Sequence, residues 1–206
     1  MKYLILRKFL SKQQCDLLVD SYKSELPSFK INLKDGGDLG NVEYSSTRSN
    51  NLRYKYTKSD HTISISNYAI DKLEGIFNVS FKGSINDVCL PMFGYGLGGN
   101  IKAHRGVQKE RNNSKYQTFV AVCQLTQRGV DFDGGRFYIN SRASASPDGK
   151  TVYGDNETDR IYPMLNKGDV CVIYNPILVH GVDVVEQSKS GSAFRLTCSW
   201  RSNNDQ

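Results

Sequence analysis

Long apolar runs are missing from this sequence of 206 residues. The most apolar stretches lie around residues 1–6 and 170–182, and both fall short of the roughly 20 consecutive apolar residues that span a bilayer. The first residues also lack the long apolar segment and the small-residue cleavage site of a signal peptide. We therefore expect a soluble, cytoplasmic protein that does not insert into a membrane.

Cysteine pairs with metal-binding spacing are also absent. The five cysteines are widely spaced: Cys15, Cys89, Cys123, Cys171 and Cys198. An odd number of cysteines, mostly inside apolar runs, is typical of buried thiols in a reducing compartment. A thiolate zinc site would need C-x2-C spacing, so the cysteines predict neither a zinc site nor a disulfide framework.

Clusters of basic residues are lacking as well, although the formal net charge is +6. Lysines and arginines are scattered among acidic residues, and no run of five or more occurs. A basic surface attracts anions in general, but this distribution does not favour nucleic acid as a partner. We expect a small-molecule substrate; the sequence gives no indication of the oligomeric state.

The apolar content predicts one domain over residues 1–206, since 38% hydrophobic residues suffice for a single core. Its first part, residues 1–78, begins with a predicted strand over 2–9. Helical patterns follow over 12–26, capped by Ser11 and ended by Pro27, and over 63–77. Between these helices the composition turns polar and glycine-rich over 30–60, which predicts an irregular loop or lid.

Beyond residue 78 the sequence consists of short β-rich runs separated by turn residues. These runs cover residues 88–95, 116–126, 135–140, 169–174, 180–186 and 194–201. Many short strands with glycine turns predict a mainly β domain with flanking helices, a sandwich or jelly roll over residues 79–206. The stretch 141–161 is poor in strand-forming residues and is interpreted as a long insertion near the site.

Histidine is scarce, and two of the three histidines stand in unusual surroundings. His104 follows the glycine-rich segment GYGLGGNIKA, and His180 ends the run GDVCVIYNPILVH. Taken singly, each is more typical of a structural histidine. A pair on strands of one barrel favours a metal site, although imidazole binds iron, copper, nickel and zinc alike, so the residue types do not choose the metal.

An arginine follows in a strand-like run, fifteen positions after His180. In SGSAFRLTCSW, alternation places Arg195 on the face opposite its apolar neighbours. An arginine that points into a barrel requires an anion, and its planar fork fits a carboxylate. The alternative is an ion pair with an acid of the chain: Asp169, Asp183 or Glu186.

Five segments carry a resemblance to a known family. In chain order they are KYLILRKFLSKQQCDLLV, GYGLGGNIKAHRG, FDGGRFYI, KGDVCVIYNPILVHGVDVV and SAFRLTCSW. Together they resemble the prolyl-4-hydroxylase-like branch of the iron(II)/2-oxoglutarate oxygenases. The resemblance covers most of the chain and implies a double-stranded β-helix, the cupin-like jelly roll. It also implies that His104 and His180 hold iron(II), that Arg195 binds 2-oxoglutarate with Tyr95 and Gln124 as further contacts, and that O2 is consumed.

The chain departs from the family pattern at Gly106. The family has His-x-Asp or His-x-Glu, so a carboxylate ligand is expected two residues after His104, where this sequence has glycine. In the related halogenases Gly or Ala replaces this carboxylate, and chloride restores the missing negative charge. The resemblance thus implies a halogenase that chlorinates an unactivated C–H bond of a small polar substrate, such as a free amino acid or a nucleotide. In the same reaction 2-oxoglutarate is decarboxylated to succinate.

Other interpretations of Gly106 stay open. If the chain is not a halogenase, it is a hydroxylase or a jelly-roll binding module without catalytic activity. The hydroxylase is either native, with water in the open position, or altered by replacement of its acidic ligand. In a further alternative, a nearby acid coordinates instead: Glu110, Asp131 or Asp133.

Overall fold

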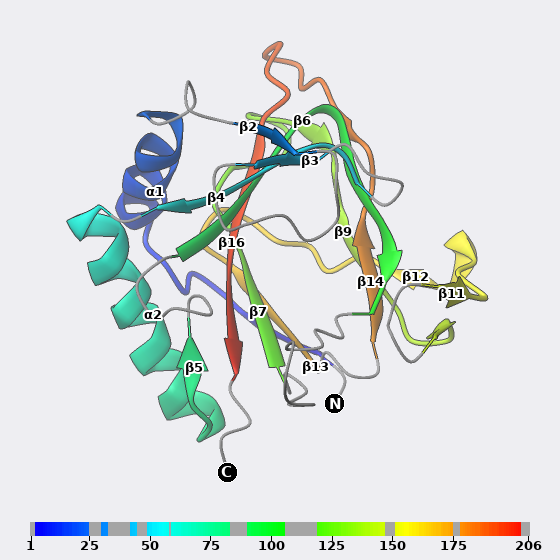
Figure 1. The fold of residues 1–206 in the computed structure, drawn as a ribbon, viewed down its shortest axis with the longest axis horizontal. Helices are drawn as coiled ribbons and strands as arrows, with labels where there is room; N and C mark the ends of the chain where they lie inside the picture. The colour runs from blue at the N-terminus through cyan, green and yellow to red at the C-terminus, as the bar shows by residue number, and fades with distance from the viewer. Residues whose placement is uncertain are drawn as a thin grey trace.

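The described residues form a curled, mostly antiparallel β-sheet with two helices on one side (Figure 1). A computed structural model describes residues 3–24, 30–32, 42–44, 49–57, 59–82, 90–105, 119–146, 151–174 and 178–202. Among these residues, no helix combines the length and the apolar composition needed to cross a bilayer.

Eight strands form the main path of the sheet. In spatial order they are β1 (Tyr3–Leu6), β13 (Val170–Tyr174), β7 (Phe119–Gln124), β16 (Arg195–Ser202), β6 (Leu90–His104), β14 (Val179–Val182), β9 (Phe137–Asn140) and β12 (Arg160–Ile161). Neighbours along this path pair in the antiparallel sense. Strands that are adjacent in space are distant in sequence, which is the connectivity of a jelly roll.

Further strands join this path or pair beside it. β4 (Ser49–Thr57) pairs with β6, β3 (Val42–Tyr44) with β4, β2 (Lys30–Asn32) with β3, and β5 (Phe81–Lys82) with β16. Two small sheets are formed by β10 (Ser144–Ala145) with β11 (Val152–Tyr153) and by β8 (Asp133–Gly134) with β15 (Val185–Glu186). A short 3-10 helix, η2 (Glu157–Asp159), precedes β12. The N-terminal part, residues 1–78, therefore contributes β1 and β4 to the same sheet as the strands beyond it.

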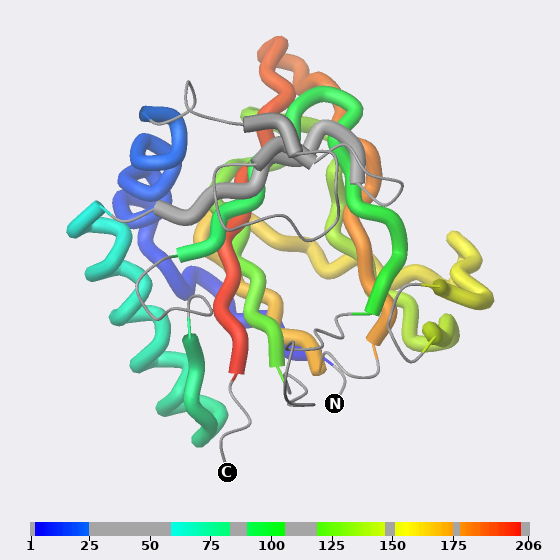
Figure 2. The backbone as a smooth tube through the Cα atoms, viewed as in Figure 1, coloured from blue at the N-terminus to red at the C-terminus, as the bar shows by residue number. Residues whose placement is uncertain are grey.

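Strand β6 carries the chain from one face of the barrel to the other. Its first half pairs with β16 up to Tyr95, and its second half pairs with β14 from Ile101 to His104. Between them Gly98 has a φ of 77°, which glycine adopts without steric cost. In Figure 2 the tube of β6 rises on one side, turns over and descends on the other. The strand predicted to end at residue 95 thus continues to His104, because the glycines serve a bend inside a paired strand.

Both predicted helices are present. At the start of α1 (Lys12–Ser24), the Gln14 N–H donates to Ser11 Oγ at 3.2 Å and the Ser11 N–H donates to Gln14 Oε1 at 2.8 Å, which forms a capping box. Helix α2 (Asp60–Phe77) begins before the predicted residue 63, because Ser59 accepts the Thr62 N–H and caps it there. Pro27 lies outside the described residues.

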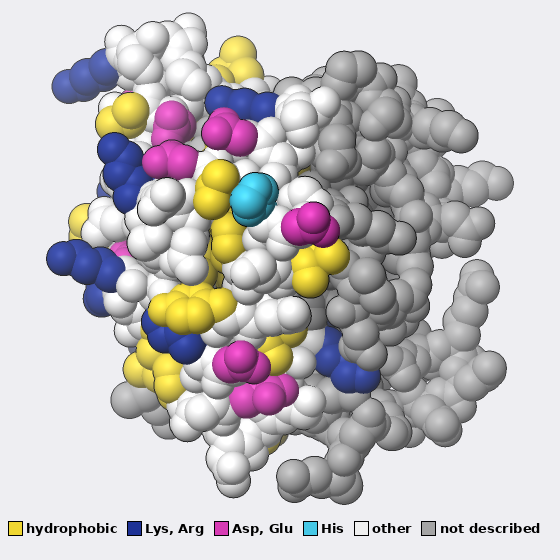
Figure 3. Space-filling view, turned by 90° about the vertical axis from the view of Figure 1, so that its left-hand side faces the viewer, with side chains coloured by type: hydrophobic (Ala, Val, Ile, Leu, Met, Phe, Trp, Pro, Cys, Tyr) yellow, Lys and Arg dark blue, Asp and Glu magenta, His cyan; other side chains and the backbone are white. Residues whose placement is uncertain are grey.

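Two apolar cores hold these layers together. One lies between the helices and the sheet and includes Leu18, Leu73 and Trp200; the other lies inside the barrel and includes Ile139 and Ile173. Figure 3 views the helix-covered face, on which basic and acidic side chains of the described residues are interspersed. The described cysteines are buried free thiols, as predicted: Cys15, Cys123, Cys171 and Cys198. Cys89 lies outside the described residues.

The prediction of an irregular loop over residues 30–60 is wrong for residues 30–32 and 42–44, which form β2 and β3, and for residues 49–57, which form β4. Its sequence NLRYKYT alternates Leu52, Tyr54 and Tyr56 with charged residues, which is the period of a strand. The polar composition of the neighbouring residues concealed this alternation. The predicted insertion over 141–161 contains only short elements in its described residues, as expected.

Candidate metal and cosubstrate site

A cavity of about 130 Å³ lies inside the barrel. Both histidines singled out in the sequence line it, together with Tyr95 and Arg195. The remaining lining is largely apolar and includes Ile101. Polar groups from four different positions thus converge on one cavity, which is typical of a small-molecule site.

The two histidines face one another across neighbouring strands. His104 ends β6, His180 lies in β14, and the two are directly opposite in the antiparallel register. Their ring centroids are 4.4 Å apart. Each Nδ1 bonds at 3.0 Å to a backbone carbonyl two residues earlier, that of Lys102 and that of Leu178. Because a carbonyl only accepts, each Nδ1 carries a proton, and in the neutral imidazole the Nε2 atom then has the lone pair that can bind a metal.

Electrostatics keep His180 in the neutral form. Burial above all, together with the charges of the nearby His104 and Arg201, lowers the pKa of His180 to about 3. The hydrogen bond to the Leu178 carbonyl opposes this shift but does not cancel it. At neutral pH the imidazole of His180 is therefore uncharged, as a metal ligand must be.

No third ligand joins the histidines within the described part of the chain, where no group of three His, Cys, Asp or Glu side chains forms a possible metal site. Asp131 accepts the Gln127 N–H at 2.7 Å, and neither Asp131 nor Asp133 is among the described residues that line the cavity. The structure therefore gives no support to either acid as the alternative ligand considered above. Gly106 and Glu110 lie outside the described residues.

Arg195 is buried, and no acid of the described residues pairs with it. It is 1% exposed, and its Nε and Nη1 atoms have no hydrogen-bond partner in the described part of the chain. The ion-pair alternative does not hold, because Asp169 binds Arg7 at 2.6 Å, Asp183 binds Arg136 at 3.2 Å, and no ion pair joins Arg195 to any described acid. Burial lowers the pKa of Arg195, which expresses the cost of its unpaired charge.

Tyr95 is the closest companion of this arginine. The two residues are opposite one another in the register of β6 and β16, and the guanidinium carbon lies 4.8 Å from the centroid of the tyrosine ring. Burial raises the pKa of Tyr95, while the charge of Arg195 opposes the shift. The hydroxyl is therefore protonated at neutral pH and can donate to an anion beside Arg195.

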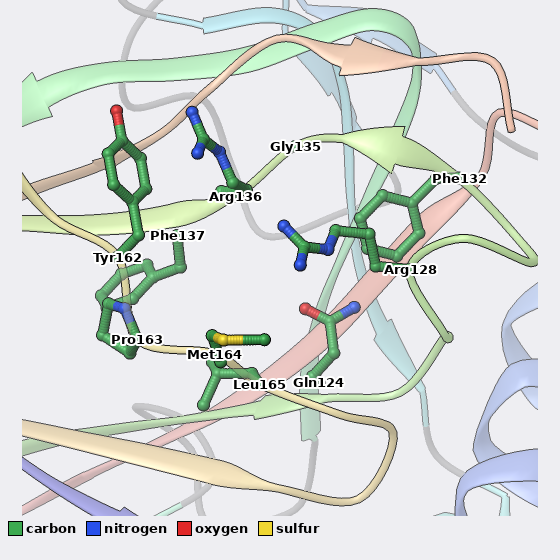
Figure 4. Close-up of a pocket in the computed structure, with 10 residues that line it drawn as sticks. All are labelled: Gln124, Arg128, Phe132, Gly135, Arg136, Phe137, Tyr162, Pro163, Met164 and Leu165. Carbon is green, nitrogen blue, oxygen red and sulfur yellow. The ribbon is translucent and has the colours of Figure 1, made fainter.

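Gln124 is not brought into this cavity. It is 3% exposed, and its amide nitrogen donates to the Thr126 carbonyl at 3.1 Å. It lines a second, smaller pocket of about 40 Å³, where Figure 4 shows it beside Arg128. Phe137 lines both spaces and so lies between them. The structure thus brings His104, His180, Arg195 and Tyr95 together and leaves Gln124 outside the group.

The sequence analysis missed one functional candidate, Arg201. Together with Thr197 and Ser199 it lines the same cavity as Arg195. All four lie on β16 at alternate positions, and alternate residues of a strand face the same side. The alternation that singled out Arg195 continues to Arg201 near the end of the strand, so the sequence carried the same signal for both arginines.

Comparison with known proteins identifies the architecture. No protein-family model matches the chain, and a search of curated proteins gives no match. Among solved structures, a Pseudomonas putida prolyl-4-hydroxylase matches with a TM-score of 0.59 and 11% identity over 100% of this chain and 94% of that one. The chain has the fold of this hydroxylase.

Two further structures agree. The 2OG complex of the viral collagen prolyl hydroxylase from Paramecium bursaria Chlorella virus-1 matches with a TM-score of 0.58 and 14% identity over 98% of this chain and 96% of that one. A Trichoplax adhaerens prolyl hydroxylase in complex with a hypoxia inducible factor peptide matches with a TM-score of 0.62 and 13% identity over 99% and 84%. The predicted double-stranded β-helix is confirmed, and at these identities the likeness concerns the fold alone.

Proposed function

We propose that this chain is an iron(II)- and 2-oxoglutarate-dependent oxidoreductase. The observation that carries the proposal is one cavity in which two facing imidazoles and a buried, unpaired guanidinium meet. Imidazole nitrogens suit iron(II), and a guanidinium fork suits a carboxylate. When bound, iron(II), 2-oxoglutarate and O2 together supply oxidation of an unactivated C–H bond, with succinate and CO2 as the products of the cosubstrate.

The residues of the chain have separate tasks in this proposal. His104 and His180 hold the metal through Nε2, and their Nδ1 hydrogen bonds fix both ring orientations. Arg195 offers two donors without partners to the distal carboxylate of 2-oxoglutarate, and Tyr95 adds its hydroxyl. Burial of His180, Tyr95 and Arg195 lowers the local polarity around them, which strengthens each electrostatic contact.

Gly106 favours halogenation as the outcome of the reaction. It stands two residues after His104, where the family pattern has a carboxylate, and glycine supplies neither a ligand nor a charge. A chloride ion would supply both. Hydroxylation is the second candidate, since the structurally similar proteins are prolyl hydroxylases. For the substrate we propose a small polar molecule, a free amino acid or a nucleotide, in keeping with the polar composition of residues 141–161.

Mass spectrometry of the products tests this proposal. Purified protein is incubated with iron(II), 2-oxoglutarate, O2 and a panel of amino acids, nucleotides and peptides, with and without chloride, and succinate is measured in parallel. We expect a chlorine isotope pattern that depends on chloride. Gain of one oxygen regardless of chloride would make the protein a hydroxylase, and absence of succinate with every substrate would favour the non-catalytic binding module.

A single substitution sharpens the distinction. Gly106→Asp returns the carboxylate of the family pattern, so we expect it to remove chlorination and to leave or create hydroxylation of the same substrate. Chlorination at an unchanged rate in Gly106→Asp would contradict the role proposed for Gly106.

A further inference from the structure

A second arginine of β16 faces the cavity and has a donor without a partner. Arg201 is half-buried and lines the cavity, and its Nε atom is buried with no hydrogen-bond partner among the described residues. No ion pair joins it to any acid of the described residues. Ser199, 3% exposed, lines the same cavity, and its hydroxyl has no hydrogen-bond partner within the same described residues. Buried donors of this kind are costly unless a ligand accepts from them.

Arg201 and Arg195 lie near opposite ends of β16. They are six residues apart on this strand, which corresponds to about 20 Å between their Cα atoms. Arg195 lies opposite Tyr95, before the bend of β6, whereas β6 returns from that bend to His104 (Figure 2). Arg201 lies toward the other end of β16, where it pairs with β5 and β7. Its side chain therefore lines the cavity at a different place from that of Arg195.

In the proposed function, both carboxylates of 2-oxoglutarate already have a place. The distal carboxylate binds Arg195, and the other is needed at the metal that the two histidines would hold. If 2-oxoglutarate occupies Arg195, the donors of Arg201 and Ser199 require a second anion.

We infer that Arg201, assisted by Ser199, binds an anionic group of the primary substrate, a carboxylate or a phosphate. The inference rests on the proposed function, which assigns Arg195 to 2-oxoglutarate. It narrows the small polar substrates proposed above to anionic ones. The guanidinium would hold this group and so orient the rest of the substrate toward the histidines.

Calorimetric titration of the anaerobic protein with iron(II) and 2-oxoglutarate tests the inference. The probes are amino acids paired with their amides, and mononucleotides paired with their nucleosides, so that the two pairs distinguish a carboxylate from a phosphate. The variants are Arg201→Gln and Arg201→Lys, with Arg128→Gln as a control because Arg128 is an exposed arginine of the second pocket. Thermal unfolding of each variant reports whether it is folded.

We expect at least one anionic probe to bind the unaltered protein about tenfold or more tightly than its neutral partner, as a charged hydrogen bond provides. Arg201→Gln should remove this preference, Arg201→Lys should retain part of it, and Arg128→Gln should leave it unchanged. The affinity for 2-oxoglutarate, followed by its absorption band with iron(II), should change less than about twofold in Arg201→Gln and fall tenfold or more in Arg195→Gln.

Two results overturn the inference: equal binding of every anionic probe and its neutral partner, or a loss of 2-oxoglutarate affinity in Arg201→Gln as large as in Arg195→Gln. Failure of the proposed function has a different signature, the absence of any 2-oxoglutarate band in the unaltered protein. In that case the same probes are titrated into Arg195→Gln and Arg201→Gln without cofactors. A preference for anions that survives in Arg195→Gln and disappears in Arg201→Gln supports the site at Arg201, and its absence from both refutes it.

Discussion

Replacing Arg195 by methionine should make the ligand-free protein more stable while removing its response to 2-oxoglutarate. Nε and Nη1 of Arg195 are buried without partners, and each unsatisfied donor costs about 1–3 kcal/mol. Methionine fills a similar volume without a charge. The variant loses the contact of the guanidinium with the Tyr95 ring at 4.8 Å, worth about 1–2 kcal/mol. The balance is a gain in the free energy of unfolding on the order of 2 kcal/mol.

Urea denaturation with and without ligand measures both effects. With iron(II) present anaerobically, 2-oxoglutarate at a hundred times its dissociation constant should stabilise the unaltered protein by about 2.7 kcal/mol. It should not stabilise Arg195→Met. A ligand-free Arg195→Met variant that is less stable by about 2 kcal/mol would show that Arg195 has a structural partner, and the assignment to an external anion would fail.

Three further substitutions test the fold around the site. Burial opposes ionisation of Asp169, but hydrogen bonds from backbone N–H groups and from Arg7 outweigh it and lower the pKa of its carboxyl. Asp169→Asn should therefore cost about 2 kcal/mol at pH 7 in urea denaturation, and this difference should shrink as the pH falls below the ordinary aspartate pKa of about 4; a difference that is unchanged at pH 3 would refute the reasoning. Gly181→Ala places a methyl group against Tyr138 and 2.8 Å from the Ile101 carbonyl, so calorimetry should show a loss of about 1–3 kcal/mol, together with weaker metal binding. Gly75→Ala, in α2 with open space around it, should instead stabilise by about 0.5–1 kcal/mol; equal effects of the two alanines would contradict the packing described here.

Local patterns in the sequence account for most of the described fold. Ser11 and Gln14 specify the start of α1 through a capping box, which depends only on residues three apart. The β-rich runs predicted β7, β9, β13 and β16 closely, because their apolar content reflects burial inside one domain. The start of α2 was predicted too late because Ser59, its cap, precedes the periodic apolar positions.

Features that depend on pairing between distant segments were harder to predict. β4 is a strand by virtue of its pairing with β6, and its polar neighbours concealed the alternation. The glycines of β6 were interpreted as the end of a strand, whereas the pairing partner changes at that point and the strand continues.

The residues of the candidate site also differ in how well the sequence predicted them. His104, His180, Tyr95 and Arg195 were predicted from the motifs that resemble a family, and the fold brings them to one cavity. Gln124 shares the strand context expected of a contact, but its amide nitrogen donates to the backbone of Thr126 and its side chain lines the other pocket. Gln124 is the last residue of β7, and the direction of a side chain at the end of a strand depends on local twist, which composition does not encode.

The central claim is that His104 and His180 hold iron(II) beside 2-oxoglutarate, and anaerobic absorption titration tests it most directly. Iron(II) and 2-oxoglutarate are added to the unaltered protein and to the variants His104→Ala and His180→Ala, and the metal-to-2-oxoglutarate charge-transfer band is recorded. We predict a saturable band in the unaltered protein and none in either variant. A band that survives in both variants, or no band in the unaltered protein, would contradict the account.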